Sequence, residues 1–282
     1  MVRSIRCFAP TALTLVACLT SQGAVRYQVN GGSPQLLSGN TIAVTTGDTR
    51  VNIFVDDVLT ENIPAIQVVG NNGNAGLQLD VLIAPENSVI GDPGSPIGRD
   101  ANNFAGLTFA DTEQRNRSRV VISLNGNLTG PVTAGIFHRL DVRDSIEAAG
   151  DVTATRLNPL GQFNSIFVVR AGRYIDGDIT AVQGSIERVR VVNLVLPVNE
   201  HGIRGNIIAD QGIIQSMAST GNIGSASAPV IRGRTIRSIF TGNADVGTLS
   251  NASVNADIRT SSSASSPIER FCPQQLRSPR ER

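Results

Sequence analysis

The sequence contains no lysine and no tryptophan, and only three cysteines and two histidines occur among its 282 residues. Aromatic side chains make up 4% of the chain, which favours a core of stacked aliphatic side chains over one built around large rings. His138 and His201 alone cannot form a multi-histidine zinc site. Because the formal net charge is only +1, the composition implies no general attraction to nucleic acid or to an acidic membrane.

Sustained helical periodicity is also missing. Only the polar stretch 110–117 resembles a helical turn. The chain contains 28 glycines and 13 prolines, together with many Asn, Ser, Thr and Val residues. This composition is typical of strands joined by turns, so we expect an all-β protein. The length allows one long domain or two small ones.

A five-residue phrase returns at nearly constant spacing in the second half of the chain. It consists of Gly, then Asn or Asp, an aliphatic residue, usually Thr, and a small residue. The leading glycines are 24, 27 and 28 residues apart, and the four copies are Gly126–Gly130, Gly150–Ala154, Gly177–Ala181 and Gly205–Ala209. A period in this range predicts a solenoid, in which each repeat forms one coil stacked on the next.

Strand geometry gives each position of the phrase a structural role. Alternate residues of a strand face opposite sides, so the aliphatic residue and the final small residue share the inward face while Thr faces outward. The leading Gly is expected to supply a backbone conformation that other residues resist. The Asn or Asp after it is expected to hold the turn through its side chain.

A second set of similar segments supports the same period. Gln183–Ile186 resembles Gln211–Ile214, 28 residues later, and Ile214–Met217 resembles Ile236–Ile239 after only 22 residues. The two sets predict a right-handed parallel β-helix, that is a β-solenoid, with coils of about 21 to 28 residues. A Gly-rich β-sandwich whose turns resemble one another is the alternative.

The predicted organisation has four parts: a signal peptide (1–23), an N-terminal β region with a cap and irregular first coils (24–125), solenoid repeats (126–258) and a flexible Ser/Arg-rich tail (259–282). Within it, strands are expected at 51–58, 66–69 and 77–84. The segment 191–198 is the most apolar and is expected to be a fully buried strand. The run 261–266 is typical of a flexible linker.

The first 24 residues predict export. Two arginines between Met1 and Arg6 precede an apolar run over 7–20, and small residues follow that suit cleavage after Gly23. This layout is typical of a secretory signal peptide, so we expect a secreted or cell-surface protein without a transmembrane segment. After such cleavage Cys272 would be the single remaining cysteine, so no intrachain disulfide could form.

An alternative to cleavage lies inside the same segment. Leu15-Val16-Ala17-Cys18 resembles the lipobox of bacterial lipoproteins. That resemblance implies cleavage before Cys18 and a lipid anchor on its thiol. An ordinary cysteine in the apolar run is the competing interpretation, and the sequence leaves both open.

Three aspartates near the repeats are the candidate catalytic or metal-binding acids. Asp176 and Asp178 can share a face, and Asp151 lies near the same position one coil earlier, about 4.8 Å away. Such a patch could serve glycoside hydrolysis, which needs two carboxylates, or bind Ca²⁺ through Asp151 and Asp178. The alternative is that these side chains only cap turns.

His201 is the candidate general acid or base. The segment Glu200-His201-Gly202-Ile203-Arg204 resembles a histidine–arginine element of polygalacturonase-type β-helix hydrolases, although the aspartate spacing of those enzymes is absent. The alternative is a solvent-exposed histidine in a turn. The sequence contains no Ser-His-Asp arrangement, phosphate-binding loop or dinucleotide fingerprint.

The repeated phrases resemble those of secreted bacterial right-handed parallel β-helix proteins and adhesin-like repeat proteins over about residues 124–258. The Ca²⁺-binding nonapeptide of RTX proteins is absent. The resemblance implies a non-enzymatic structural or adhesive surface protein whose partner is a polysaccharide or another surface protein. The alternative that it implies is a polysaccharide lyase or glycoside hydrolase that uses Asp151, Asp176, Asp178 and His201.

Overall fold

The computed structural model describes residues 25–45, 47–48, 50–55, 62–70, 78–83, 103–109, 119–157, 164–193, 196, 200–224, 229–241, 254–260 and 268–272. The regular structure in these ranges is β-strand, which confirms the all-β prediction. None of the described segments forms a helix long and apolar enough to cross a membrane. The predictions for 1–23 with Cys18, for 110–117, for the Ser-rich linker and for residues after 272 lie outside these ranges.

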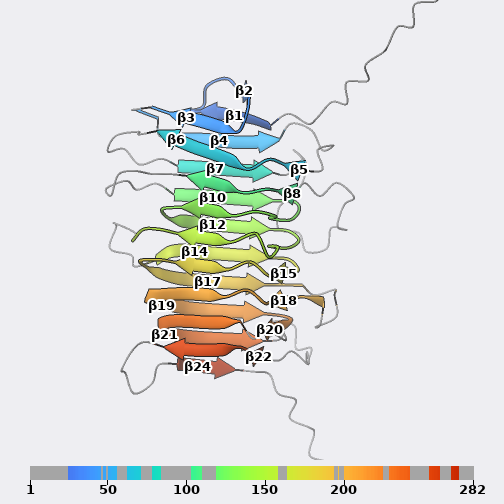
Figure 1. The fold of residues 1–282 in the computed structure, drawn as a ribbon, viewed down its shortest axis with the longest axis vertical. Coiled ribbons are helices and arrows are strands. Elements are labelled where there is room, and N and C mark those ends of the chain that lie inside the picture. The colour runs from blue at the N-terminus through green and yellow to red at the C-terminus, as the bar shows by residue number, and fades with distance from the viewer. Residues whose placement is uncertain are drawn as a thin grey trace, which may run out of the picture.

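Most strands belong to one long sheet whose neighbouring strands are mostly parallel. Figure 1 shows them stacked from the N-terminal strands in blue to the C-terminal strands in red. The chain runs along three sides of the stack in turn, and we call one complete pass along all three sides a layer. This arrangement is compatible with the predicted solenoid.

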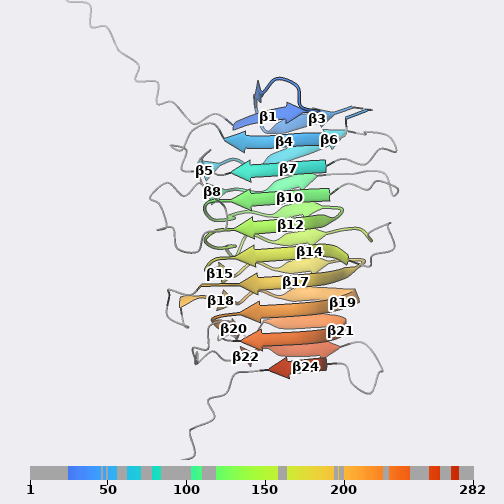
Figure 2. The same cartoon turned by 180° about the vertical axis from the view of Figure 1, so that it is seen from behind.

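The broad side carries the longest strands: β4 (Arg50–Val55), β7 (Gln78–Ile83), β10 (Arg119–Leu124), β12 (Phe137–Val142), β14 (Asn164–Ala171), β17 (Ser185–Val191), the second halves of β19 (Ile207–Ser219) and β21 (Val230–Thr241), and β24 (Ile268–Cys272). Figure 2 shows the same stack from behind.

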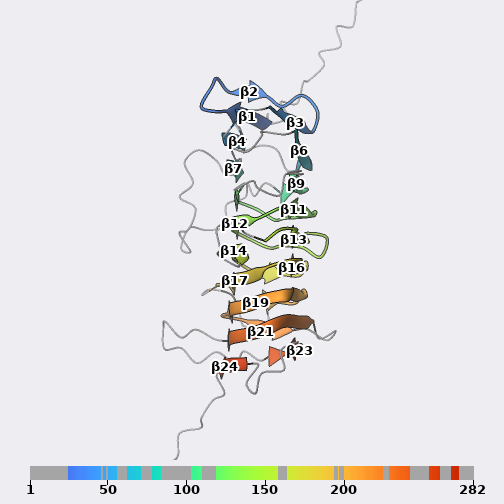
Figure 3. The same ribbon diagram turned by 90° about the vertical axis from the view of Figure 1, so that its left-hand side faces the viewer.

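The second side, which we call the threonine side, consists of β3 (Thr41–Val44), β6 (Ile66–Gly70), β9 (Leu107–Phe109), β11 (Val132–Ala134), β13 (Val152–Ala154), β16 (Ile179–Ala181), the first halves of β19 and β21, and β23 (Asp257–Thr260). Figure 3 shows β11, β13 and β16 opposite β12, β14 and β17, with β19 and β21 spanning both sides.

The narrow side is built from very short strands: β5 (Asn62–Ile63), β8 (Asn103–Phe104), β15 (Tyr174–Ile175), β18 (Gly202–Ile203), β20 (Asn222–Gly224) and β22 (Val254–Asn255). Single bridges at Leu128 and Ile146 connect β8 to β15. The side chains that point inward from the three sides form one continuous aliphatic core, in which Phe104 and Phe137 are fully buried.

Three copies of the repeated phrase are in the predicted register. Val152 pairs with Ile179, which in turn pairs with Ile207, and all three side chains are fully buried. Thr153 and Thr180 are half-buried on the outer surface of the threonine side, as the alternation predicts. The second set of segments is also confirmed, since Ile186 pairs with Ile214.

The first copy, however, was aligned incorrectly. Val152 pairs with Val132, so the true predecessor of Val152-Thr153-Ala154 is Val132-Thr133-Ala134, only 20 residues earlier. Leu128 is buried as expected, but it lies on the narrow side and pairs with Phe104 and Ile146.

The glycines of the phrase are needed for a reason other than the one predicted. None of Gly150, Gly177 and Gly205 has φ in the left-handed range. A Cβ atom on Gly205 would lie 2.1 Å from the carbonyl oxygen of Gly177, and one on Gly177 would lie 2.7 Å from that of Gly150. Glycine is required because the backbones of adjacent layers approach too closely for any side chain.

The expected buried strand at 191–198 is not formed by its described residues. Val191 ends β17, and Val192, Asn193 and Leu196 are half-buried outside any strand. The side chain of Asn193 accepts a hydrogen bond from the backbone N–H of Leu196 at 2.9 Å, which turns the chain. This local hydrogen bond therefore favours a turn in a segment whose high apolar content predicted a strand.

The strand stack extends beyond both ends of the predicted repeats. β4, β6 and β7 match the expected strands at 51–58, 66–69 and 77–84 over their described residues. In the segment predicted as a flexible tail, β24 pairs in parallel with β21, from Ile236 opposite Ile268 to Phe240 opposite Cys272.

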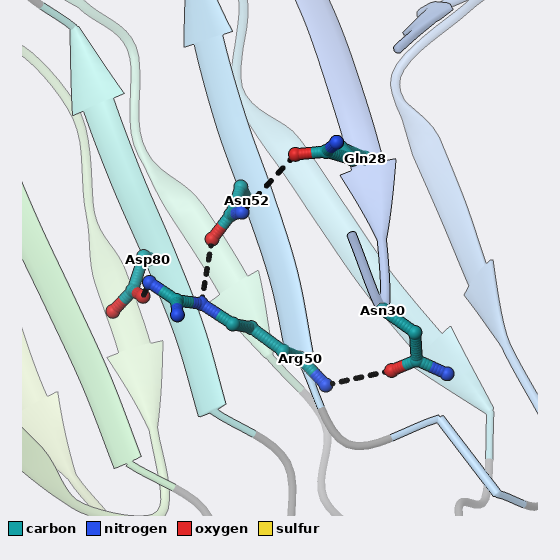
Figure 4. A network of polar contacts seen from close by, with 5 residues as sticks. All are labelled: Gln28, Asn30, Arg50, Asn52 and Asp80. Atoms are coloured by element: carbon teal, nitrogen blue, oxygen red, sulfur yellow. Dashed lines mark hydrogen bonds and ion pairs between the residues drawn. The ribbon is translucent and has the colours of Figure 1, made fainter. Parts of the chain in front are cut away.

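At the N-terminal end, β1 (Val25–Val29) pairs antiparallel with both β4 and β2 (Gln35–Leu36). Figure 4 shows a polar network that joins this end to the next strands. Arg50 donates to Asn52 at 3.0 Å and to Asp80 at 2.7 Å, Asn52 donates to Gln28 at 3.4 Å, and the backbone N–H of Arg50 donates to Asn30 at 3.1 Å.

Candidate functional site

Asp151 and Asp178 belong to a hydrogen-bond ladder between layers. The Oδ1 atom of Asp151 accepts the backbone N–H of Asp178 at 2.8 Å, and Oδ1 of Asp178 accepts the backbone N–H of Asn206 at 2.8 Å. Asn206 continues the series by accepting the N–H of Val230 at 2.7 Å. Parallel pairing places the same side chain above itself in each layer, so one polar position satisfies backbone donors along the stack.

A second ladder of the same kind runs along the narrow side. The side chain of Asn103 accepts the backbone N–H of Asn127 at 3.3 Å, and that of Asn127 accepts the N–H of Ser145 at 2.9 Å. This ladder explains the incorrect alignment of Gly126–Gly130. The Gly-Asx-aliphatic turn occurs at two different corners of a layer, and sequence similarity does not distinguish the corners.

Asp176 lies two residues before Asp178 but on the narrow side, in different surroundings. Its Oδ1 atom is 3.8 Å from Nη1 of Arg204 in the next layer. The guanidinium of Arg204 lies over the Tyr174 ring, 3.6 Å from the ring centre. Burial raises the pKa of the Asp176 carboxyl above its ordinary value, and the charge of Arg204 opposes this shift only in part.

His201 is 2% exposed, so the expectation of a solvent-exposed turn was wrong. The next layer covers it: a Cβ atom on Gly221 would lie 2.0 Å from the carbonyl oxygen of His201 and 2.7 Å from its Cδ2 atom. The imidazole is thus enclosed between layers. Arg204, the partner of Asp176, follows three residues later in the chain.

The structure therefore brings together only some of the candidate residues. Asp151 and Asp178 are neighbours in one ladder, Asp176 contacts Arg204 on the narrow side, and His201 is buried beneath the next layer. Within the described part of the chain, no three His, Cys, Asp or Glu side chains are grouped so that they could hold a metal ion. Calcium binding by Asp151 and Asp178 stays a prediction.

One prediction separates a ladder role from a catalytic role at Asp178. Asp178→Ala leaves the N–H of Asn206 without its acceptor and should lower the free energy of unfolding by about 1 to 2 kcal/mol. Asp178→Asn should cost less, about 1 kcal/mol, because an amide oxygen can still accept the N–H of Asn206, as Asn206 does toward Val230, and only the bond from Nδ2 of Asn206 to Oδ2 of Asp178 is lost. Urea unfolding of both variants measures the difference; equal losses would contradict the ladder role.

The raised pKa of Asp176 predicts a pH-dependent contribution to stability. The folded state binds this proton more tightly than the unfolded state, so the contribution of Asp176 to the free energy of unfolding falls as the pH rises through the folded pKa. Asp176→Asn should therefore be more stable than the wild type at neutral pH, and the gain should vanish below about pH 4. Urea unfolding at both pH values tests this, and a variant that is less stable at neutral pH would contradict it.

The sequence interpretation missed a group of arginines on the broad side. Arg139 on β12 pairs with Val168 on β14, and Val168 pairs with Arg188 on β17, so these three residues form one column across the sheet. The adjacent column contains Asp141, Arg170 and Arg190. We call Arg139, Arg170, Arg188 and Arg190 the arginine face. The spacing of these arginines is irregular along the chain, so only the register of the strands shows that they are neighbours.

Comparison of the chain with known protein families, with curated proteins and with solved structures found no match.

Proposed function

We propose that the chain is a right-handed parallel β-solenoid that is exported and serves, without catalysis, as a structural or adhesive protein of a bacterial type of cell surface. The repeated visit to three sides and the parallel pairing of successive layers support the solenoid. Parallel strands joined by crossover connections are almost always right-handed, which supports the handedness.

The two asparagine–aspartate ladders are the observation that carries the non-catalytic function. Asp151 and Asp178, which the sequence offered as catalytic acids, accept backbone hydrogen bonds between layers. In the ladder Asn206 replaces a carboxylate without a change of role. The most regular polar positions of the repeat therefore serve the stack, and the outer faces of the strands are available for contacts with other molecules.

The core also suits an exported chain that has no intrachain disulfide. Inward side chains from all three sides form one apolar cluster that extends from Ile42 to Ile239. Burial of apolar surface contributes about 25 cal/mol per Å², so stacking can supply the stability that small secreted proteins obtain from disulfides.

Mass spectrometry of the mature N-terminus, combined with protease treatment of intact bacterial cells that express the full chain, tests this proposal. We expect a chain that begins at Ala24 and lies outside the cytoplasm. The control is Leu15→Arg, which interrupts the apolar run and should keep the full-length chain inside. Cys18→Ala should not change export if cleavage follows Gly23, whereas it should abolish processing if Cys18 is lipidated. An intact N-terminus on a protease-protected wild-type chain would overturn the proposal.

A further inference from the structure

The broad side presents arginines in two adjacent columns over the consecutive strands β12, β14 and β17. We infer that this arginine face binds a linear acidic polysaccharide, with its guanidinium groups contacting the carboxylates or sulfates spaced along the glycan. The inference deepens the proposed adhesive function and rests on it.

The register defines the spacing of the charges. Arg170 and Arg190 are direct partners on neighbouring strands, which lie about 4.8 Å apart. Arg139 and Arg188 are two strands apart, and so roughly 10 Å. The two columns are separated by two residues of extended chain, about 7 Å, so the sheet holds four arginines at fixed positions in a grid whose other two positions are Val168 and Asp141. A preorganised grid binds a repeating polyanion with little loss of conformational freedom.

The positive charge of this grid is only partly neutralised. Asp141, which is 7% exposed, forms an ion pair with Arg139. Glu187 lies beside the grid and accepts a hydrogen bond from Asn164 at 3.0 Å. Neither Arg170 nor Arg188 forms an ion pair with another described residue. The two columns on these three strands thus combine four arginines with one aspartate.

The two columns carry no charge on the strands that directly flank β12 and β17. On β10 the two columns continue as Val121 and Ser123, and on β19 they continue as Ser216 and Ala218. Small and neutral side chains on both sides leave the guanidinium groups accessible to a chain that lies across the sheet. Arginine suits this role because its planar group can contact a carboxylate or sulfate through two parallel hydrogen bonds.

One aromatic contact at the edge of the grid favours a sugar over a nucleic acid. The rings of His138 and Phe167 lie 5.1 Å apart on neighbouring strands, next to Arg139 and Val168. An apolar face of a pyranose ring can pack on this pair. Single-stranded nucleic acid instead requires a series of aromatic platforms for successive bases, and the described strands of the arginine face present only this pair.

The test measures binding of the purified chain to polygalacturonate, dextran sulfate, neutral dextran and a single-stranded oligodeoxynucleotide in about 0.1 M salt. We expect binding to one or both acidic glycans, weakening as salt increases, and none to neutral dextran. The double variant R170Q/R188Q should bind at least about tenfold more weakly, because two charge-assisted contacts are lost. Arg139 is left unchanged because its loss would strand the buried Asp141 carboxylate.

R234Q/R259Q is the control for net charge, since it also removes two arginines, both outside the arginine face and one of them paired with Asp257, and it should bind as the wild type does. Circular dichroism of each variant shows whether it is folded. Equal weakening in both double variants, failure to bind both acidic glycans, or tighter binding of the oligonucleotide would overturn the inference. None of these outcomes affects export, which the N-terminal analysis tests separately.

Discussion

Gly205→Ala is expected to lower the free energy of unfolding by about 3 kcal/mol, near the upper end for overpacking substitutions. The added Cβ would lie 2.1 Å from the carbonyl oxygen of Gly177 and 2.6 Å from its carbonyl carbon. Both atoms belong to the backbone of the neighbouring layer, so relief requires two layers to separate. The midpoint of urea unfolding, followed by circular dichroism, measures the loss.

Gly135→Ala is the matched control for this substitution. A Cβ atom there would first meet Cδ of Arg156 at 3.3 Å, and that flexible side chain can move aside. The control should change the free energy of unfolding by less than about 1 kcal/mol. Similar losses for the two variants would show that the stacked glycines are not fixed by the approach of adjacent layers.

Ile207→Ala is the second substitution for which we expect a large effect, a loss of about 3 kcal/mol in the free energy of unfolding. The side chain is fully buried and lies in register between Ile179 and Ile231, so its truncation leaves a cavity between two layers. Urea unfolding again provides the measurement.

The adjacent residue Ile208 supplies the control, because it carries the same side chain on the opposite face of the same strand. It is half-buried, pairs with Thr180 and Arg232, and lies on the outer surface of the threonine side. Ile208→Ala should cost less than about 1 kcal/mol. A reversed order of the two losses would contradict the orientation of β19 and with it the register of the threonine side.

The sequence predicted the strand class and much of the register because these depend on local alternation. A buried aliphatic residue and, two residues later, a small inward residue recur at Val152, Ile179 and Ile207, with Thr between them in the first two copies and Ile208 in the third, and each triplet lies in the expected strand. The corner at which a turn belongs depends on the length of the preceding segment. For that reason Leu128 was assigned to the wrong side, although its burial was predicted correctly.

The environment of the candidate residues could not be predicted, because each feature that the sequence interpretation missed is a contact between layers. The burial of His201 results from Gly221, a residue 20 positions later whose lack of a side chain permits close packing. The assignment of Asp178 to a ladder depends on the N–H of Asn206, and the arginine face depends on pairings over 20 or more residues. Composition and spacing contain no information on these pairings until the register is known.

The antiparallel strand β1 ends the series of parallel layers at the N-terminal end of the stack. A stack of identical parallel layers has no inherent length, since each exposed strand edge offers its backbone groups to a further strand. β1 interrupts that repetition by running against β4, and the Arg50 network anchors the reversed strand. The parallel pairing of successive layers therefore ends at β1, and a duplicated repeat would add a layer within the stack, between β4 and β24.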